Sequence, residues 1–191
     1  MPRSGADARR RLQQAALDLY RERGFDRTTA ADIAERAGVN ARTFFRHFPD
    51  KREVLFDGEA DLRSALVRSV SEASEGLGPV EVLLYAFRQC AHLLEDDRAF
   101  SEPRLALIAE TPTLRERDLA KGAAMAAALA EALQHRGVDE RQAGLAAHVG
   151  WATFHHAAQN WIDDPAPGLE EHLVRAFAAV RTLFGHQGLR S

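Results

Sequence analysis

The 191-residue sequence lacks the features on which small secreted, zinc-binding and membrane proteins depend. Cys90 is its single cysteine, so no internal disulfide can form, and no Cys and His cluster has the spacing of a structural zinc site. No apolar run approaches the roughly 18 residues that span a bilayer. The basic start of the chain is not followed by the apolar stretch of a secretory signal. We therefore expect a soluble, cytoplasmic protein with no metal, no cofactor and no membrane partner.

Strand signals are also scarce, which favours an all-α fold. Alternation of period two is nearly absent, β-branched residues are few, and Ala, Leu, Arg and Glu dominate. Gly and Pro separate the helical runs, which we place at 8–23, 30–37, 41–47, 51–75, 79–96, 101–110, 113–136, 139–163 and 167–185. The predicted domains are residues 1–56 and 57–191, and their boundary falls inside the run 51–75, which would join them as one rigid helix.

The charge of the chain is distributed unevenly between these two parts. Residues 1–56 carry twelve Lys and Arg against eight Asp and Glu, a net charge of +4. The remaining residues carry thirteen against twenty, a net charge of −7, and the whole chain has −3. A basic head on an acidic body indicates that only the head approaches a polyanion such as nucleic acid.

Two short predicted helices lie in this basic head. Thr29 and Asp32 have the spacing of a capping box at the start of the run 30–37. Gly38 permits a sharp turn, and Asn40 can cap the run 41–47. Two helices joined in this way form a helix-turn-helix, whose second helix can enter the DNA major groove.

Residues 28–51 resemble the DNA-binding signature of the TetR family of transcriptional regulators. The matching stretch reads TTAADIAERAGVNARTFFRHFPDK, and Gly24-Phe25 before it also fits. The resemblance implies an all-helical homodimer, with a three-helix DNA-binding domain followed by a larger ligand-binding and dimerisation domain. It also implies that the run 41–47 and its flanks contact DNA. The residues implied to contact phosphates are Thr29, Thr43, His47 and Lys51, and those implied to face bases are Asn40, Ala41, Arg42 and Phe45. Arg46 lies beside them and is also implied to contact DNA.

The sequence departs from the family pattern at two of these positions. Phe45 stands where tyrosine is usual, so a hydroxyl is lost and an apolar ring remains. Arg42 stands where a small residue is common and adds a five-donor guanidinium suited to guanine O6 and N7. We hypothesise that Arg42 is the main specificity residue.

The last two predicted helices carry apolar stripes, one of small residues that would permit close approach of a neighbouring helix. The resemblance implies that these helices meet their symmetry mates, and a two-fold dimer would read a palindromic operator. The alternative is that both stripes are buried inside one subunit. The candidate dimer residues are Gly150, Thr153, Ala157, Trp161, Leu173, Phe177, Val180 and Phe184.

Residues 104–117 and the helix that contains Trp161 look like the acyl-CoA-like ligand-binding bodies of actinobacterial, mycofactocin-type regulators. The resemblance implies a small apolar effector, with an acyl-CoA as the candidate and Arg88 or Arg104 holding its polar groups. The candidate cavity residues are Phe87, Arg88, Phe100, Arg104, Leu107, Met125, Trp151 and His155. Each aromatic among them also fits an ordinary core position.

Two other functions are weighed against a regulator. A metal-dependent enzyme could use His155 and His156, but adjacent helical residues point about 100° apart, and no catalytic motif accompanies them. A helical small-molecule-binding protein without DNA affinity would not need Arg42, Arg46 and Lys51. We therefore expect no enzyme but a DNA-binding regulator, acting as a repressor that a small ligand releases.

Overall fold

The structure is a computed structural model that describes residues 3–96 and 98–185. Within these ranges the regular elements are all helices, which confirms the predicted all-α class. The chain forms two compact units: residues up to Glu59 join Ala99–Leu119 in the first, and Ala60–Arg98 joins residues from Ala120 onward in the second. Among the described helices, none is both long and apolar enough to cross a membrane.

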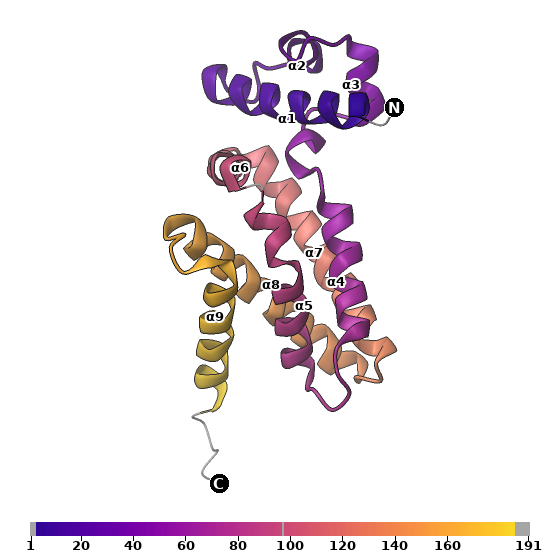
Figure 1. Ribbon diagram of the computed structural model, residues 1–191, viewed down its shortest axis with the longest axis vertical. Coiled ribbons are helices and arrows are strands. Elements are labelled where there is room, and N and C mark those ends of the chain that lie inside the picture. Colours follow the sequence, from indigo (N-terminus) through magenta and orange to yellow (C-terminus); the bar gives the residue numbers. More distant parts are fainter. Residues whose placement is uncertain (1–2, 97, 186–191) are drawn as a thin grey trace. The chain divides into compact units, whose positions relative to one another are not determined.

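The first unit begins with a cluster of three helices (Figure 1). Its elements are α1 (Arg3–Arg23), α2 (Ala30–Arg36), α3 (Ala41–His47), the 3-10 helix η1 (Glu53–Phe56), most of α6 (Arg98–Glu110) and the start of α7 (Pro112–His135). An apolar face of α1 is buried, with Leu12 and Tyr20 at 2% exposure or less. It packs in one cluster with Ile33 of α2 and Phe44 of α3, so α1 supplies the base on which the two short helices rest.

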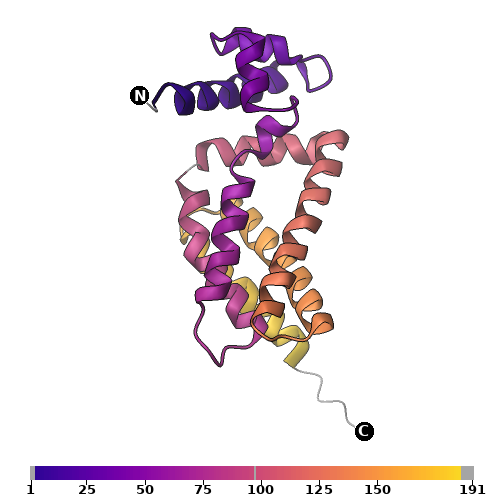
Figure 2. The same ribbon diagram turned by 90° about the vertical axis from the view of Figure 1, so that its right-hand side faces the viewer.

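Helix α6 and the start of α7 complete the core of this first unit. Ile108 and Leu114 are buried in the same cluster as Leu55 and Phe56. The Arg104 Nη1 donates to the carbonyl of Leu55 at 2.9 Å. The chain turns sharply between α6 and α7, where Pro112 begins the new helix (Figure 2). The first compact unit therefore includes a segment more than forty residues beyond η1 in the chain.

The prediction of one continuous helix over 51–75 is wrong, because the helical conformation is interrupted at Gly58. This glycine has φ of +86°, in the left-handed region that an L-residue rarely adopts. Asp57 before it is extended, with ψ of 144°. The run is therefore divided into η1 and α4 (Glu59–Glu72), and no rigid helix passes through this point.

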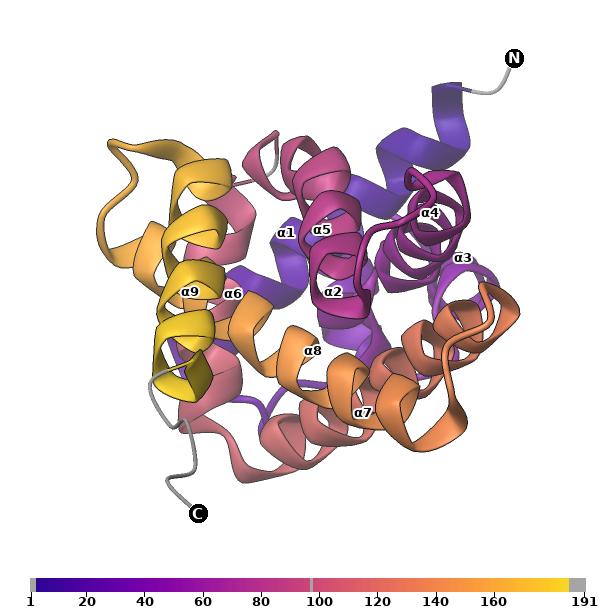
Figure 3. The ribbon, with the colours of Figure 1, turned by 90° about the horizontal axis from the view of Figure 1, so that it is seen from below.

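The second unit packs α9 (Gly168–Gly185) against α8 (Glu140–Asp163) and α5 (Pro79–Glu95) (Figure 3). Two long side chains close helix ends within it. The Glu95 carboxylate accepts from the amide of Leu169 at 2.7 Å, at the start of α9. The Arg136 guanidinium donates to carbonyls at the end of α4, those of Val70 at 3.1 Å and Ala73 at 2.8 Å among them. Both contacts satisfy backbone groups that a helix terminus leaves unpaired.

Candidate nucleic-acid interface

Helices α2 and α3 and the turn between them form the helix-turn-helix that the sequence predicts. The Thr29 hydroxyl accepts from the amide of Asp32 at 3.1 Å, and the Asp32 carboxylate accepts from the amide of Thr29 at 2.8 Å, so the capping box is complete. Gly38 has φ of +68°, as the sharp turn requires. The Asn40 side chain accepts from the amide of Thr43 at 2.8 Å and caps α3. Each such cap stabilises its helix by about 1 kcal/mol.

Buried aromatic side chains fix the orientation of α3 on the unit. Phe44 is fully buried and Phe48 is 2% exposed, with 5.8 Å between their ring centroids. Ile33 of α2 belongs to the same cluster. Because one side of the seven-residue α3 is committed to this core, its opposite side faces solvent in a defined direction.

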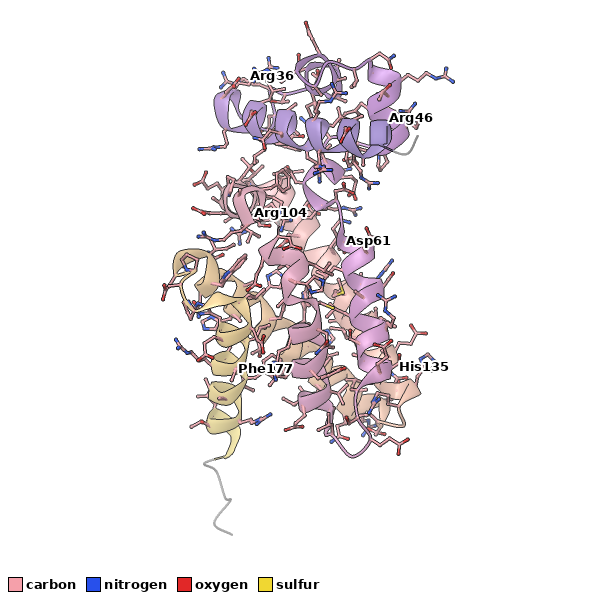
Figure 4. All side chains as sticks on the ribbon, viewed as in Figure 1. Arg36, Arg46, Asp61, Arg104, His135 and Phe177 are labelled. Carbon is pink, nitrogen blue, oxygen red and sulfur yellow. The ribbon has the colours of Figure 1, made fainter. Side chains whose placement is uncertain are left out.

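The solvent side of α3 carries two rows of side chains at i, i+4 spacing. Ala41 and Phe45 form an apolar row, and Phe45 is 57% exposed. Arg42 and Arg46 form a cationic row beside it, and both are exposed. Neither guanidinium forms an ion pair with the described residues, and Figure 4 shows Arg46 on this helix. Their donors are therefore available to base edges or phosphates.

His47 at the end of α3 is half-buried. Its Nε2 is buried and has no hydrogen-bond partner among the described residues. Burial lowers the pKa of His47 below its ordinary value, and the charges of Arg46 and Arg9 lower it further, while Asp57 opposes them. The imidazole is therefore held neutral at neutral pH, and protonation would make both of its ring nitrogens donors.

Lys51 is bound to the chain's own backbone. Its Nζ donates to the carbonyls of Phe25 at 2.8 Å and Thr28 at 2.9 Å, and it lies 4.2 Å from the centroid of the Phe25 ring. An ammonium group has three N–H donors, so one is left for a phosphate. The residue thus fastens the loop before α2, a role that the sequence alone did not reveal.

Several other arginines of the first unit are paired with acids. Arg9 forms an ion pair with Asp57, and Arg52 pairs with Asp50 at 2.8 Å. Arg36 of α2, which Figure 4 labels, donates two bonds to Glu22. These bonds are 2.9 and 2.7 Å long, and the pairing lowers the pKa of the Glu22 carboxyl. These three arginines are therefore partly neutralised by acids, unlike Arg42 and Arg46 of α3.

Known family models match the sequences of both parts of the chain. The model of bacterial regulatory proteins of the tetR family matches residues 12–57, and the model of the MftR C-terminal domain matches residues 77–185. The chain belongs to the tetR family. This confirms the predicted resemblance at both ends of the chain.

Individual relatives of this tetR-family chain are named as regulators, not enzymes. The HTH-type transcriptional regulator TcmR of Streptomyces glaucescens is 31% identical over 138 residues, 69% of this chain and 61% of TcmR. MftR of Mycobacterium tuberculosis is 23% identical over 192 residues, 94% of this chain and 96% of MftR. Two mycobacterial HTH-type regulators match over 37% and 29% of their own lengths, so the chain spans less than two thirds of TcmR and of these two.

A solved structure aligns along nearly the whole chain. FadR of Thermus thermophilus, a tetR-family transcriptional repressor in complex with lauroyl-CoA, aligns over 96% of this chain and 97% of its own. The sequence identity is 27% and the TM-score 0.56. The two chains therefore share the tetR-family fold along nearly their whole lengths.

The residues predicted to line a ligand cavity fall into both units of the tetR-family chain. Phe100, Arg104 and Leu107 belong to the first unit and pack or bond around η1. Met125, Phe87 and Trp151 belong to the second unit and pack in its core cluster. His155 is exposed on α8, with its ring edge against Trp151 at 4.9 Å. The eight residues are therefore divided between the cores of two units and the surface.

Arg88 does not line an apolar cavity, which corrects the prediction. Its side chain is 48% exposed on α5 and forms an ion pair with Glu170 of α9. A long charged side chain with a surface partner gains nothing from turning into a core. Arg88 therefore links two helices of the second unit.

Aromatic rings in the second unit stack on one another. The ring centroids of Phe87 and Phe154 lie 4.8 Å apart, and those of Phe154 and Trp151 lie 5.1 Å apart. Both pairs are stacked. Phe177 reaches Phe87 from α9 at 5.9 Å and points inward from that helix (Figure 4). Such rings contribute both buried area and ring–ring attraction. In this structure they serve as core, the alternative that the sequence left open.

The predicted dimer stripe is buried inside one chain, which corrects its assignment. Thr153, Ala157 and Trp161 of α8 are 6% exposed or less, and Leu173 and Phe177 of α9 are 1% or less. A Cβ built on Gly150 would approach Leu83 Cδ1 to 2.7 Å, so the small residue serves the packing of α5 on α8. Val180 is half-buried, and the side chain of Phe184 lies outside the described residues.

Proposed function

We propose that this tetR-family transcriptional regulator binds double-stranded DNA through α3 and is released by a small apolar effector. The main support for the proposal is that Arg42 and Arg46 are exposed on the solvent side of α3 and unpaired among the described residues. They present strong donors on a short helix whose far side is anchored by Phe44. A helix held in this way can enter a major groove without reorganising.

The remaining predicted DNA-binding residues have parts in this proposal. Thr29 and Thr43 stand at the starts of α2 and α3, and His47 at the end of α3, where phosphates would pass. Asn40 and Ala41 lie at the exposed start of α3, and Lys51 keeps one donor free. Phosphate contacts would position the domain, and base contacts would specify the sequence. We retain residues 1–56 as the DNA-binding domain and 57–191 as the ligand-binding and dimerisation domain.

Arg42 tests the specificity part of the proposal. A bidentate contact to guanine O6 and N7 discriminates bases by about 1–3 kcal/mol. We expect Arg42→Ala to flatten the base preference at one position of each half-site, measured by binding to a panel of single-base operator variants. Arg46→Ala serves as the matched control. Equal weakening on every duplex of the panel would exclude Arg42 as the specificity residue.

The proposed effector is a small apolar molecule, with acyl-CoAs as the first class to examine. FadR of Thermus thermophilus, at 27% identity, was solved in complex with lauroyl-CoA. An effector shifts the balance only if it binds the DNA-incompetent state more tightly than the competent one. We expect acyl-CoAs to release the protein from DNA in a chain-length-dependent way, measured by anisotropy. Tight binding to DNA that no acyl-CoA disturbs would exclude this class and leave DNA binding intact.

The proposed homodimer uses the exposed faces of α8 and α9 in place of the buried stripe. Large apolar side chains on these faces are Leu145 at 69%, Val174 at 37% and Leu183 at 74% exposure. A dimer would bind a palindromic operator and act as a repressor there. We expect Leu145→Glu with Leu183→Glu to give monomers in analytical ultracentrifugation, with Leu93→Glu on α5 as control. A dimer unaffected by the double change would contradict this surface.

A further inference from the structure

Phe45 is an unusual side chain to expose on a DNA-reading helix. Its phenyl ring is 57% exposed on α3, in the part of that helix that faces solvent. The ring is held in place by the buried Phe44, whose centroid lies 5.3 Å away with an interplanar angle of 81°. An edge-to-face contact of this kind is worth about 0.5–1.5 kcal/mol beyond burial, so the ring projects in a fixed direction.

The chemistry of a phenyl ring restricts what it can recognise in DNA. It has no donor or acceptor, so it cannot bond a phosphate oxygen or a polar base edge. In the major groove the apolar group is the C5-methyl of thymine, which Phe and Ala side chains contact. Ala41 lies one helical turn before Phe45 in the same row and is also exposed.

We propose that Phe45, with Ala41 beside it, reads the 5-methyl group of a thymine in each operator half-site. This inference rests on the proposed DNA binding and deepens it. The cationic row of Arg42 and Arg46 runs parallel to the apolar row on α3. The operator half-site therefore combines a methyl-bearing position, read by the apolar row, with positions read by guanidinium donors.

The test removes the methyl group from the DNA and keeps the base pair. An operator is first selected from a randomised duplex pool with the full chain. Each thymine of the half-site is then replaced by deoxyuridine, symmetrically in both halves. Burying one methyl group strengthens binding about fourfold, so we expect one thymine position at which replacement in both halves weakens binding roughly 16-fold.

Coupling to Phe45 separates a base contact from a general effect on the helix. Phe45→Ala should bind the thymine and deoxyuridine operators equally, whereas Phe45→Tyr keeps the ring and should retain the methyl preference. Leu77→Ala, which removes a 41% exposed apolar side chain from the second unit, should behave as wild type. At the same position, a 5-methylcytosine pair should be bound more tightly than a cytosine pair by wild type but not by Phe45→Ala.

Each outcome has a defined meaning. Wild-type binding that is unchanged by deoxyuridine at every thymine, or selected half-sites without a conserved thymine, would overturn the inference and leave DNA binding standing. The same loss in wild type and Phe45→Ala would also overturn it, because the methyl would then be read elsewhere. Failure to bind any duplex in a salt-dependent manner would instead overturn the proposed function itself.

Discussion

At the scale of single residues, side chains expected to contact DNA also build the motif that presents them. Thr29 and Asn40, for which the family resemblance implies DNA contacts, cap α2 and α3 with their side-chain oxygens, as their spacing predicts. Lys51 uses two of its donors on backbone carbonyls. The caps could be predicted because they follow from spacing within four residues. The Lys51 contacts could not, since they join positions 23 and 26 residues apart.

Lys51 gives a prediction that separates its two roles. Lys51→Met keeps the aliphatic stem and removes the ammonium that binds the carbonyls of Phe25 and Thr28. Hydrogen bonds to a charged group contribute about 1.5–3 kcal/mol, so we expect the free energy of unfolding in urea to fall by about 2 kcal/mol. Arg52→Met, which removes an exposed pair with Asp50, should lower the free energy of unfolding much less. Unchanged stability with lost DNA affinity would make Lys51 a phosphate contact alone.

His47 gives a pH-dependence prediction. Its pKa is lowered in the folded chain, mainly by burial, so below about pH 6.5 the unfolded chain takes up a proton that the folded chain resists. Stability should therefore decline as the pH falls through this region, and His47→Gln should show a shallower decline. Urea unfolding at about pH 7.5, 6.5 and 5.5, values that bracket the ordinary histidine pKa, measures the stability of both proteins. Identical pH profiles for the two proteins would contradict the assignment.

At the scale of elements, periodicity predicted which faces are apolar but not what covers them. The stripe on α8 was correctly identified as a close-packing face, yet it is buried within the same chain, with Gly150 against Leu83 of α5. The break at Gly58 was missed because the residues on both sides of it favour helix. The membership of α6 in the first unit was also beyond sequence reasoning, because it depends on contacts between Leu55 and Arg104, 49 residues apart.

Leu114 tests whether α6 and the start of α7 support the DNA-binding helices. This side chain is fully buried in the cluster that contains Phe44 and Ile33, although it lies far outside residues 12–57. Leu114→Ala should cost about 2–5 kcal/mol and lower the hydrogen-exchange protection of amides in α1. Leu119→Ala, at a 70% exposed position of the same helix, should have no effect. Unchanged protection in α1 would show that the amino-terminal helices are stable without this segment.

At the scale of the whole molecule, positive charge is local. Residues 1–56 carry +4, but the first compact unit as a whole has fifteen basic against fourteen acidic side chains, a net charge of +1. The sequence suggested a basic domain, whereas the structure gives a nearly neutral unit with unpaired guanidiniums on α3. DNA affinity should consequently depend on the contacts that the guanidiniums of α3 make more than on the electrostatic field of the whole first unit.

The most direct test of DNA binding through α3 is fluorescence anisotropy on DNA from the protein's own upstream region across a series of salt concentrations. We expect log affinity to fall linearly with log salt, by about 0.9 per phosphate contact. The double variant Arg42→Ala with Arg46→Ala should weaken binding and reduce this slope, while Arg63→Ala on α4 should match wild type. Binding insensitive to salt, or equally strong in the double variant, would contradict the claim that α3 is the DNA-binding element.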